Sequence, residues 1–188
     1  MKKSSKAFII LGLILVCVLA GYGYVSGIYN NLVSQEESVE AAWSDVQNQY
    51  QRRLDLIPSL TLTVKRVALQ EADAFKALTD ARKAASAKVN ISNSIINNEQ
   101  DLNDYIRCQE QLGAAIDNIL SIENSYSELS KSQNFAGLKE QIETANNKIL
   151  ASQKEYNHIA LAYNTTIRKM PAVLFAGSFG FSKKAYIK

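Results

Sequence analysis

The longest apolar stretch of the chain covers residues 7–25 and carries no charged side chain. Nineteen helical residues at about 1.5 Å each span about 28 Å, close to the hydrocarbon thickness of a bilayer. Because backbone polar groups in lipid need partners within the chain, such a stretch adopts a helix. The pattern therefore predicts a transmembrane helix over residues 7–25, after a short N-terminal segment of residues 1–6.

The charges that flank this stretch are unequal. Lys2, Lys3 and Lys6 precede it, whereas residues 26–48 contain no Lys or Arg. Positively charged flanks tend to stay on the cytoplasmic side of a membrane. We therefore expect a single-pass membrane protein with a cytoplasmic N-terminus and an exported C-terminal domain, periplasmic or extracellular.

Two other interpretations of the stretch stay open. Val18 and Ala20 have the spacing of a signal-peptidase site, which would place a cut after Ala20. Cys17 would allow a lipoprotein, although Val16 before it is larger than the residue such processing prefers. The apolar run is longer than the core of a usual signal peptide, which favours a retained anchor.

Beyond the anchor, apolar residues recur at steps of three and four, which is typical of packed helices. Four stripes have this spacing: Val39 to Ile57, Leu60 to Arg82, Leu102 to Tyr126 and Phe135 to Met170. Pro58 separates the first two. Because proline suits a first helical turn and resists a helix interior, a new helix is expected to begin there. A kink at Pro58 instead of a reversal would leave three long helices.

The joints between the stripes are short. Residues 88–98 are rich in Asn and Ser and predict a loop, Asn98 can cap the third helix, and Ser132 or Asn134 can cap the fourth. Helices of similar length with short joints favour an antiparallel arrangement. We therefore expect an all-α chain, in which the transmembrane helix is followed by an antiparallel up-and-down four-helix bundle over residues 29–170.

Charge narrows the possible functions. The chain has 21 basic and 18 acidic residues, and six of its lysines lie in the first six and last six residues. The remaining body carries 15 basic and 18 acidic residues, so it lacks the basic excess that nucleic-acid binding needs. No nucleic-acid partner is expected.

Side chains that could carry catalysis are few. Cys17 and Cys108 lie in different parts of the chain and predict no disulfide, and His158 is the single histidine. The sequence has no metal-ligand spacing, cofactor motif or paired nucleophile and base. We expect no cofactor, no metal and no enzymatic activity.

An Arg-Arg-X-Asp-Leu-Ile-Pro run covers residues 52–58, and two Tyr-Asn pairs stand seven residues apart, at 156–157 and 163–164. With these motifs the chain resembles the LemA family, bacterial proteins with one N-terminal membrane helix and a helical domain. The positions that carry the resemblance include Tyr29, Asn30, Ala42, Trp43, Arg52, Arg53, Asp55, Pro58, Glu71, Arg82, Tyr156, Asn157, Tyr163, Asn164, Met170, Pro171, Gly180 and Phe181. The resemblance implies a four-helix bundle at a membrane and implies no activity.

A buried arginine is expected in the bundle, because Arg53 stands on an apolar stripe. In the up-and-down arrangement Arg53 lies level with Glu123 and Glu140. A buried charge is costly without a partner. We therefore predict that Arg53 pairs with one of these two glutamates.

Other polar residues also stand on or beside the stripes. Glu71 is expected at mid-height, level with Lys148 or Gln153. Asn157 and Asn164 are seven apart and share a helix face, which predicts side-chain hydrogen bonds across the bundle. The polar set either fixes the register of the bundle, which we favour, or lines a polar ligand site.

The C-terminal tail, residues 171–188, combines aromatic and basic side chains. The fourth helix is expected to return to the membrane and to bring this tail beside it. Aromatic residues with lysines suit the lipid headgroup region, which predicts a peripheral membrane contact. The expected contact residues are Phe175, Phe179, Phe181, Lys183 and Lys184. In the other interpretation the phenylalanines cover the end of the core and the lysines are solvated.

Together these features predict a membrane-tethered, non-enzymatic interaction or scaffold module of the bacterial cell envelope. Its expected partners are membrane lipid and other envelope proteins, which would meet the outward surface near Pro58 and Lys131. The alternative is a ligand-sensing helical bundle coupled to the membrane helix. The structural or interaction candidates are Trp43, Arg52, Arg53, Asp55, Pro58, Glu71, Glu123, Tyr156, Asn157, Tyr163 and Asn164.

Overall fold

The computed structural model describes residues 2–88 and 92–188, and this part of the chain is helical without any strand. Its α-helices are α1 (Lys2–Lys65), α2 (Ala72–Ser86), α3 (Glu99–Ser121), α4 (Ser127–Ser130) and α5 (Gln133–Thr166). The 3-10 helices are η1 (Asn93–Asn97), η2 (Ile122–Ser125) and η3 (Ala172–Leu174). The all-α class is thus confirmed. Met1 of the predicted N-terminal segment and residues 89–91 of the predicted loop lie outside the described part, and most of the remaining loop forms η1.

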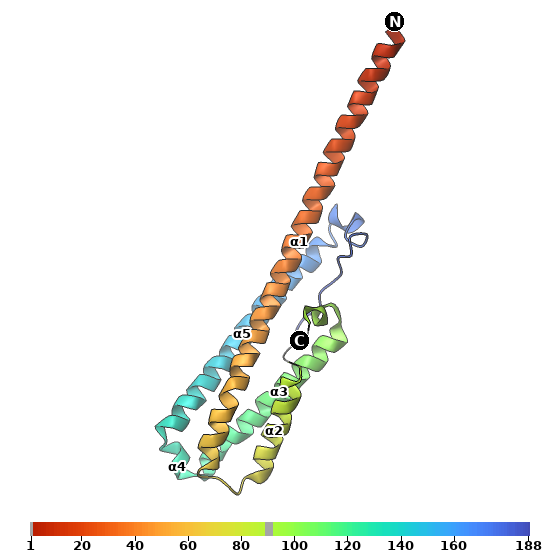
Figure 1. Cartoon of the computed structure of the whole chain (residues 1–188). Coiled ribbons are helices and arrows are strands. Elements are labelled where there is room, and N and C mark those ends of the chain that lie inside the picture. The colour runs from red at the N-terminus through yellow and green to blue at the C-terminus, as the bar shows by residue number, and fades with distance from the viewer. Residues whose placement is uncertain (1, 89–91) are drawn as a thin grey trace.

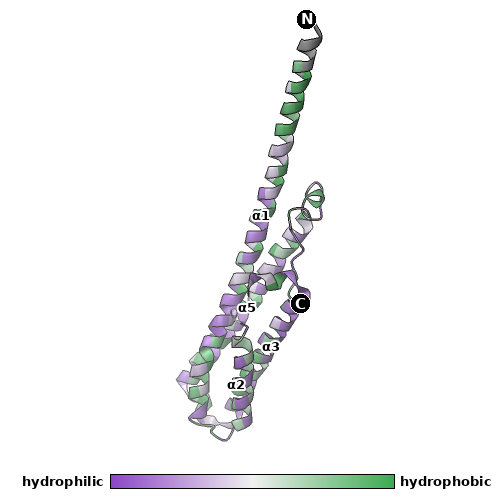
Figure 2. Cartoon of the chain, turned by 45° about the vertical axis from the view of Figure 1, so that its right-hand side comes forward, coloured by the Kyte–Doolittle hydropathy of each residue, from purple (hydrophilic) through white to green (hydrophobic). Residues whose placement is uncertain are grey.

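The predicted transmembrane segment is the first part of α1, which continues without a break into the helical domain (Figure 1). By length and composition, α1 is the one helix of the described residues that could cross a membrane. Figure 2 shows its N-terminal part as a mostly hydrophobic rod that projects beyond the other helices. Residues 10–24 are exposed all round, which suits a helix surrounded by lipid.

The helix α1 also runs through Pro58, where we predicted that the chain would turn. A proline inside a helix costs about 3 kcal/mol because it removes one hydrogen bond and crowds the preceding turn. Around it Leu54, Leu60 and Val64 are buried, none more than 4% exposed. Each such side chain contributes about 1.5–3 kcal/mol on burial, so packing outweighs the cost of the proline. The reversal falls at residues 66–71 instead.

Successive long helices alternate in direction, and α5 runs back along α1 (Figure 1). The helix α1 packs mainly against α5, while α2 packs mainly against α3. The core has an anchor-side cluster, which includes Trp43, Tyr105 and Tyr156, and a far-side cluster, which includes Leu60 and Phe135. The Trp43 ring meets the rings of Tyr105 and Tyr156 edge-on at 5.4 and 5.7 Å. Trp43 is therefore a core residue of the anchor-side cluster.

Two predicted helix caps are confirmed. At the start of α3, Oδ1 of Asn98 accepts a hydrogen bond from the backbone N–H of Gln100 at 2.9 Å. At the start of α5 the cap is Ser132 and not Asn134. The Ser132 Oγ accepts a hydrogen bond from the backbone N–H of Phe135 at 3.3 Å. Each cap satisfies an N–H group that the first turn of a helix leaves without an intrahelical partner.

Candidate functional site

Arg53 lies in the interior between α1, α3 and α5 and is only 6% exposed. Its Nη2 donates to the backbone oxygen of Gln109 at 2.6 Å and to the side-chain Oε1 of Gln109 at 3.3 Å. Its Nη1 donates to Oδ1 of Asn146 at 3.4 Å, and its guanidinium carbon lies 5.4 Å from the centre of the Tyr50 ring. Within the described residues these acceptors are neutral, so the charge of Arg53 has no carboxylate in direct contact.

The predicted ion pair of Arg53 with Glu123 or Glu140 is therefore wrong. Glu123 pairs instead with Lys139 at 2.8 Å, and Glu140 lines a surface groove between α1 and α5. The prediction placed Arg53 close to the far end of the bundle because it assumed a reversal at Pro58. The helix α1 continues seven residues further, about 10 Å, which changes the level of every residue that follows.

Burial changes the proton affinity of this cluster. Desolvation lowers the pKa of Arg53, and the nearby groups Tyr50 and Asp117 oppose that shift. Burial raises the pKa of Tyr50 to about 12, against the opposing effects of the Arg53 charge and a hydrogen bond from Gln153. That hydrogen bond joins Nε2 of Gln153 to the Tyr50 hydroxyl at 2.6 Å. At neutral pH the site therefore holds a charged guanidinium beside a neutral phenol.

This polar cluster adjoins a cleft of about 450 Å³ between α1, α3 and α5. Gly113 lies in its wall, and a Cβ added there would sit 3.3 Å from Nη1 of Arg53. One buried donor, Nε of Arg53, has no hydrogen-bond partner among the described residues. Buried donors are nearly always satisfied in folded proteins. The arrangement is thus a polar site with unused hydrogen-bonding capacity.

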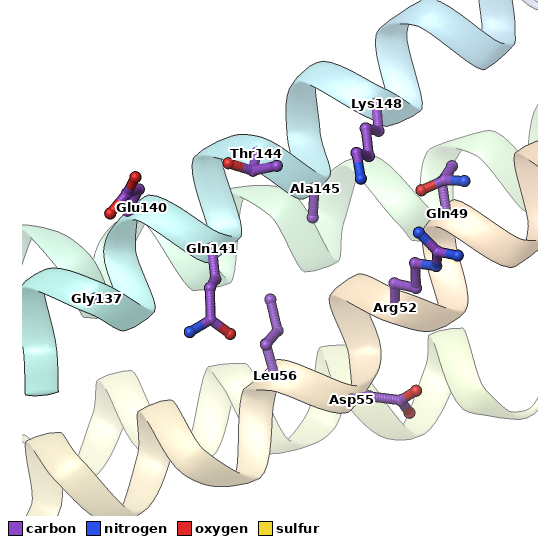
Figure 3. Close-up of a pocket in the computed structure, with 10 residues that line it drawn as sticks. All are labelled: Gln49, Arg52, Asp55, Leu56, Gly137, Glu140, Gln141, Thr144, Ala145 and Lys148. Carbon is purple, nitrogen blue, oxygen red and sulfur yellow. The ribbon is translucent and has the colours of Figure 1, made fainter.

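A second groove, about 600 Å³, runs over the surface between α1 and α5 (Figure 3). Arg52 on α1 and Lys148 on α5 lie on its two sides, and both are exposed. Asp55 also lines the groove, and its Oδ1 accepts a hydrogen bond from Nε2 of Gln51 at 2.7 Å. Arg52 and Asp55 are therefore solvated surface residues, unlike Arg53 between them.

Glu71 stands immediately before α2, at the end of the 66–71 turn, and not at mid-height as predicted. Its Oε1 accepts a hydrogen bond from the Tyr126 hydroxyl at 3.0 Å. Its expected neighbours, Lys148 and Gln153, line clefts elsewhere in the domain. The displaced reversal is again the reason. Through this hydrogen bond, Glu71 ties the 66–71 turn to Tyr126 in the segment between α3 and α4.

The tail ends in an extended segment, residues 181–188, that returns along the domain toward η1 and the start of α3 (Figure 1). Asn164 donates from Nδ2 to the backbone oxygen of Lys184 at 2.9 Å and accepts at Oδ1 from the Lys184 N–H at 2.8 Å. Asn157 binds Ile187 in the same way, at 2.7 and 2.9 Å. We expected these amides to bond across the bundle, but their partners are the backbone of the tail.

The spacing of the two Tyr-Asn pairs matches the repeat of an extended chain. Seven helical residues rise about 10.5 Å, and three extended residues span about 10 Å. Asn157 and Asn164 therefore meet tail residues that are three apart. The Tyr156 hydroxyl donates to the backbone oxygen of Ala185 at 2.7 Å, and the Ala185 N–H donates to the backbone oxygen of Ile96 at 2.7 Å. The tail is thus held on both sides.

Lys184 is buried inside the domain, at 2% exposure. Its Nζ lies 2.5 Å from the Glu36 carboxylate and 2.8 Å from Oδ1 of Asn97, and 5.7 Å from the centre of the Tyr163 ring. This ion pair removes Lys184 from the expected membrane contacts. Phe181, at 9% exposure, is removed as well, because its ring belongs to the anchor-side core.

The other expected membrane contacts stay at least partly exposed. Lys183 is exposed, with its Nζ 5.5 Å from the centre of the Tyr186 ring. The rings of Phe175 and Phe179 stack at 6.2 Å. Phe179 also meets the ring of Tyr29 edge-on at 5.2 Å. The loop that carries these phenylalanines therefore lies against α1, close to the end of its apolar segment.

Sequence reasoning missed several partners in these clusters. The sequence contained a usable signal for Gln109, because it is a polar residue at an apolar stripe position. In the structure Gln109 is only 1% exposed. No comparable signal in the sequence marked Glu36 or Asn97. Glu36 and its partner Lys184 are 148 residues apart, and no local pattern connects them.

These features define a class of protein: an all-helical domain carried on a long N-terminal helix whose first part is apolar. The model of the LemA family matches residues 42–188, and the chain belongs to that family. The match begins after the apolar segment and includes Arg53, both Tyr-Asn pairs and the tail. No curated protein matches the chain.

Proposed function

We propose that the protein is a membrane-tethered, non-enzymatic helical module of the bacterial cell envelope that binds or organises other envelope components. The observation that carries this proposal is the continuity of α1, a single helix from the apolar segment to Lys65 in the domain. In this proposal α1, α2, α3 and α5 act as an antiparallel up-and-down four-helix bundle. The unbroken helix holds that bundle at a fixed distance from the bilayer.

The proposed orientation leaves the N-terminus in the cytoplasm and exports the domain. Support comes from Lys2, Lys3 and Lys6, since positive flanks favour the cytoplasmic side. Reporter fusions at the C-terminus test it in cells. An alkaline phosphatase fusion should be active and a green fluorescent protein fusion dark. The reverse pattern would contradict this orientation.

A second contact with lipid is proposed for the segment 168–179. Four of its apolar side chains are strongly exposed: Met170 at 71%, Leu174 at 62%, Val173 at 46% and Phe179 at 38%. Phe179 packs against Tyr29, which follows the end of the predicted anchor by about one helical turn, about 6 Å. Arg168 and Lys169 are exposed beside them and suit anionic headgroups.

Quenching by lipids with a doxyl group on the acyl chain tests this contact in nanodiscs. Cys17 and Cys108 are replaced by Ser, and a fluorescent label is attached at Leu174→Cys. The matched control is Leu69→Cys, since Leu69 is 76% exposed in the 66–71 turn. We expect quenching at position 174 and none at position 69. Equal signals at both positions would exclude the lipid contact.

Partner proteins are proposed to bind the end of the domain that faces away from the anchor. Leu62 and Leu69 are 64% and 76% exposed there, and large exposed apolar side chains are common in binding surfaces. A photo-crosslinking residue at Leu69 should capture a discrete product in cells. The control is the same residue at Leu161, which is 55% exposed on α5. Identical products from both positions would contradict a specific surface at the far end.

A ligand-sensing bundle is the second candidate function, and the cleft beside Arg53 favours it. The cleft is formed by α1, α3 and α5, so a ligand there would contact the helix that carries the anchor. Ligand binding that changes crosslinking at Leu69 would support sensing over passive tethering.

A further inference from the structure

The polar cluster around Arg53 has a buried positive charge without a direct counter-ion. Taking a charge out of water costs several kcal/mol unless a partner of opposite charge compensates. Here the acceptors are one backbone carbonyl and two side-chain amides, from Gln109 and Asn146. The Arg53 Nε donor has no partner among the described residues. Its surroundings therefore suit an added carboxylate better than they suit the charge alone.

The cleft gives such a carboxylate a route to the guanidinium. Gly113 leaves space beside Nη1 of Arg53, since any side chain there would begin 3.3 Å from that atom. The contact from Nη1 to Asn146 is long, at 3.4 Å, so it is the weakest of the hydrogen bonds of Arg53. A ligand oxygen that enters past Gly113 can replace it with a shorter, charge-assisted bond.

The rim of the same cleft has the opposite charge. Glu110 and Asp117 line the cleft from α3 and are exposed, whereas Arg53 is buried. A simple anion would be repelled at such a rim. A ligand with a positive group at its other end would be attracted at both places.

The other residues that line the cleft, and the volume of the cleft, narrow the class of ligand further. Ala114, Ile149 and Leu150 supply apolar surface, and Gln153 supplies an amide. A cleft of about 450 Å³ lies in the range of small-molecule sites. A small zwitterion with an apolar side chain meets all of these conditions.

We propose that this cleft binds a zwitterionic ligand of the α-amino acid class, with its carboxylate at Arg53 and its ammonium group at Glu110 and Asp117. The proposal goes beyond the tethering function and is independent of it. It also names the ligand class that the sensing alternative requires. The competing explanation is that Arg53 only holds α1, α3 and α5 in register, which would need no ligand.

Calorimetric titration of the full-length protein in nanodiscs tests the proposal with three probes. L-leucine carries both charges, N-acetyl-L-leucine keeps the carboxylate alone, and L-leucinamide keeps the ammonium alone. We expect leucine to bind, and N-acetyl-leucine to bind about two- to fivefold more weakly because it loses only the contact with the exposed rim. Leucinamide should bind at least about fivefold more weakly, because it loses the charge-assisted bond to buried Arg53. Binding of N-acetyl-leucine as tight as that of leucine would overturn the proposal. The absence of leucine binding at about 10 mM, a concentration at which even a millimolar Kd gives a signal, would overturn it as well.

Variants that leave the fold intact sharpen the test. Glu110→Gln together with Asp117→Asn changes only exposed rim residues and should weaken leucine binding by about two- to fivefold. The matched control Glu155→Gln, also exposed but outside the cleft, should leave it unchanged. Equal affinities in the rim variant and the control would overturn the assigned role of the rim.

Gly113→Ala tests access to the guanidinium. The added methyl group lies beside Nη1 of Arg53, while alanine favours a helix more than glycine does. We expect leucine binding to fall at least fivefold while the helical signal in circular dichroism is kept. Undiminished binding by this folded variant would place the ligand elsewhere and overturn the assignment.

Discussion

Asn164 holds the backbone of Lys184 through two hydrogen bonds, one donated and one accepted, at 2.9 and 2.8 Å. Both residues are buried, at 3% and 2% exposure. The amide of Asn164 thus satisfies both polar groups of one tail residue, as a neighbouring strand does in a sheet. This relationship makes the C-terminal tail a part of the folded domain.

Replacing Asn164 should loosen the tail and destabilise the protein. Asn164→Ala leaves the N–H and the carbonyl of Lys184 without their partners, and each loss costs about 1–3 kcal/mol. We expect the free energy of unfolding to fall by about 2–6 kcal/mol, the sum of the two losses. Urea unfolding in detergent, followed by the fluorescence of the single tryptophan, Trp43, measures this change.

Asn147→Ala is the control for that experiment, because Asn147 is exposed on the same helix. It should change stability by no more than about 0.5 kcal/mol. If both alanine variants lose the same stability, the clamp on the tail makes no specific contribution.

The stability that the protein loses without the ion pair of Lys184 and Glu36 should depend on the residue that replaces Lys184. Lys184→Ala removes the charge and opens a cavity, whereas Lys184→Met keeps most of the apolar length. Because Glu36 stays partly exposed at 27%, water can solvate its carboxylate when the partner is lost. We expect Lys184→Ala to cost about 3 kcal/mol and Lys184→Met about 1 kcal/mol in urea unfolding. A larger loss for Met than for Ala would contradict this account.

Replacing Pro58 should stabilise the domain, because this proline lies inside α1 and is exposed. Pro58→Ala restores an N–H that can donate to the carbonyl of Leu54, and it removes no buried surface. We expect a gain of about 1–2 kcal/mol, less than the full difference in helix propensity because the unfolded chain also gains freedom. Thermal unfolding of the original protein and of the Pro58→Ala variant measures this gain in stability. A loss of stability would show that the proline shapes α1 in a way the domain requires.

Stability should fall at alkaline pH through the buried tyrosines. Burial raises the pKa of Tyr50 from its ordinary value of 10 to about 12, so the folded state keeps this proton to higher pH than the unfolded state. The contribution of the protonated Tyr50 hydroxyl to the free energy of unfolding is therefore complete below pH 10 and is lost as pH rises from 10 to 12. Two pKa units correspond to about 2.7 kcal/mol.

Urea unfolding from pH 8 to 11.5 measures this dependence, with Tyr50→Phe as the comparison. The variant lacks the ionisable group and should lose less stability over the same range, after an initial cost from the missing Gln153 hydrogen bond. The same slope in both proteins would assign the alkaline loss to other groups.

Local patterns in the sequence were sufficient for several elements. The apolar stretch of residues 7–25, the caps at Asn98 and Ser132 and most of the apolar stripes were predicted, because each depends on neighbours within one or two helical turns. Arg53 was correctly predicted to be buried. Its partners were not, because they depend on how three helices lie against one another.

By itself, the sequence determined an all-helical chain with an apolar N-terminal segment and a set of amphipathic helix faces, since helix periodicity and end signals are local. Only the tertiary structure decided that α1 passes through Pro58, because the burial of its neighbours outweighs a local penalty. The tertiary structure likewise selected neutral partners for Arg53 and brought Lys184 to Glu36. Contacts between distant residues depend on the register of the helices, and a shift of the first reversal by seven residues changes all of them.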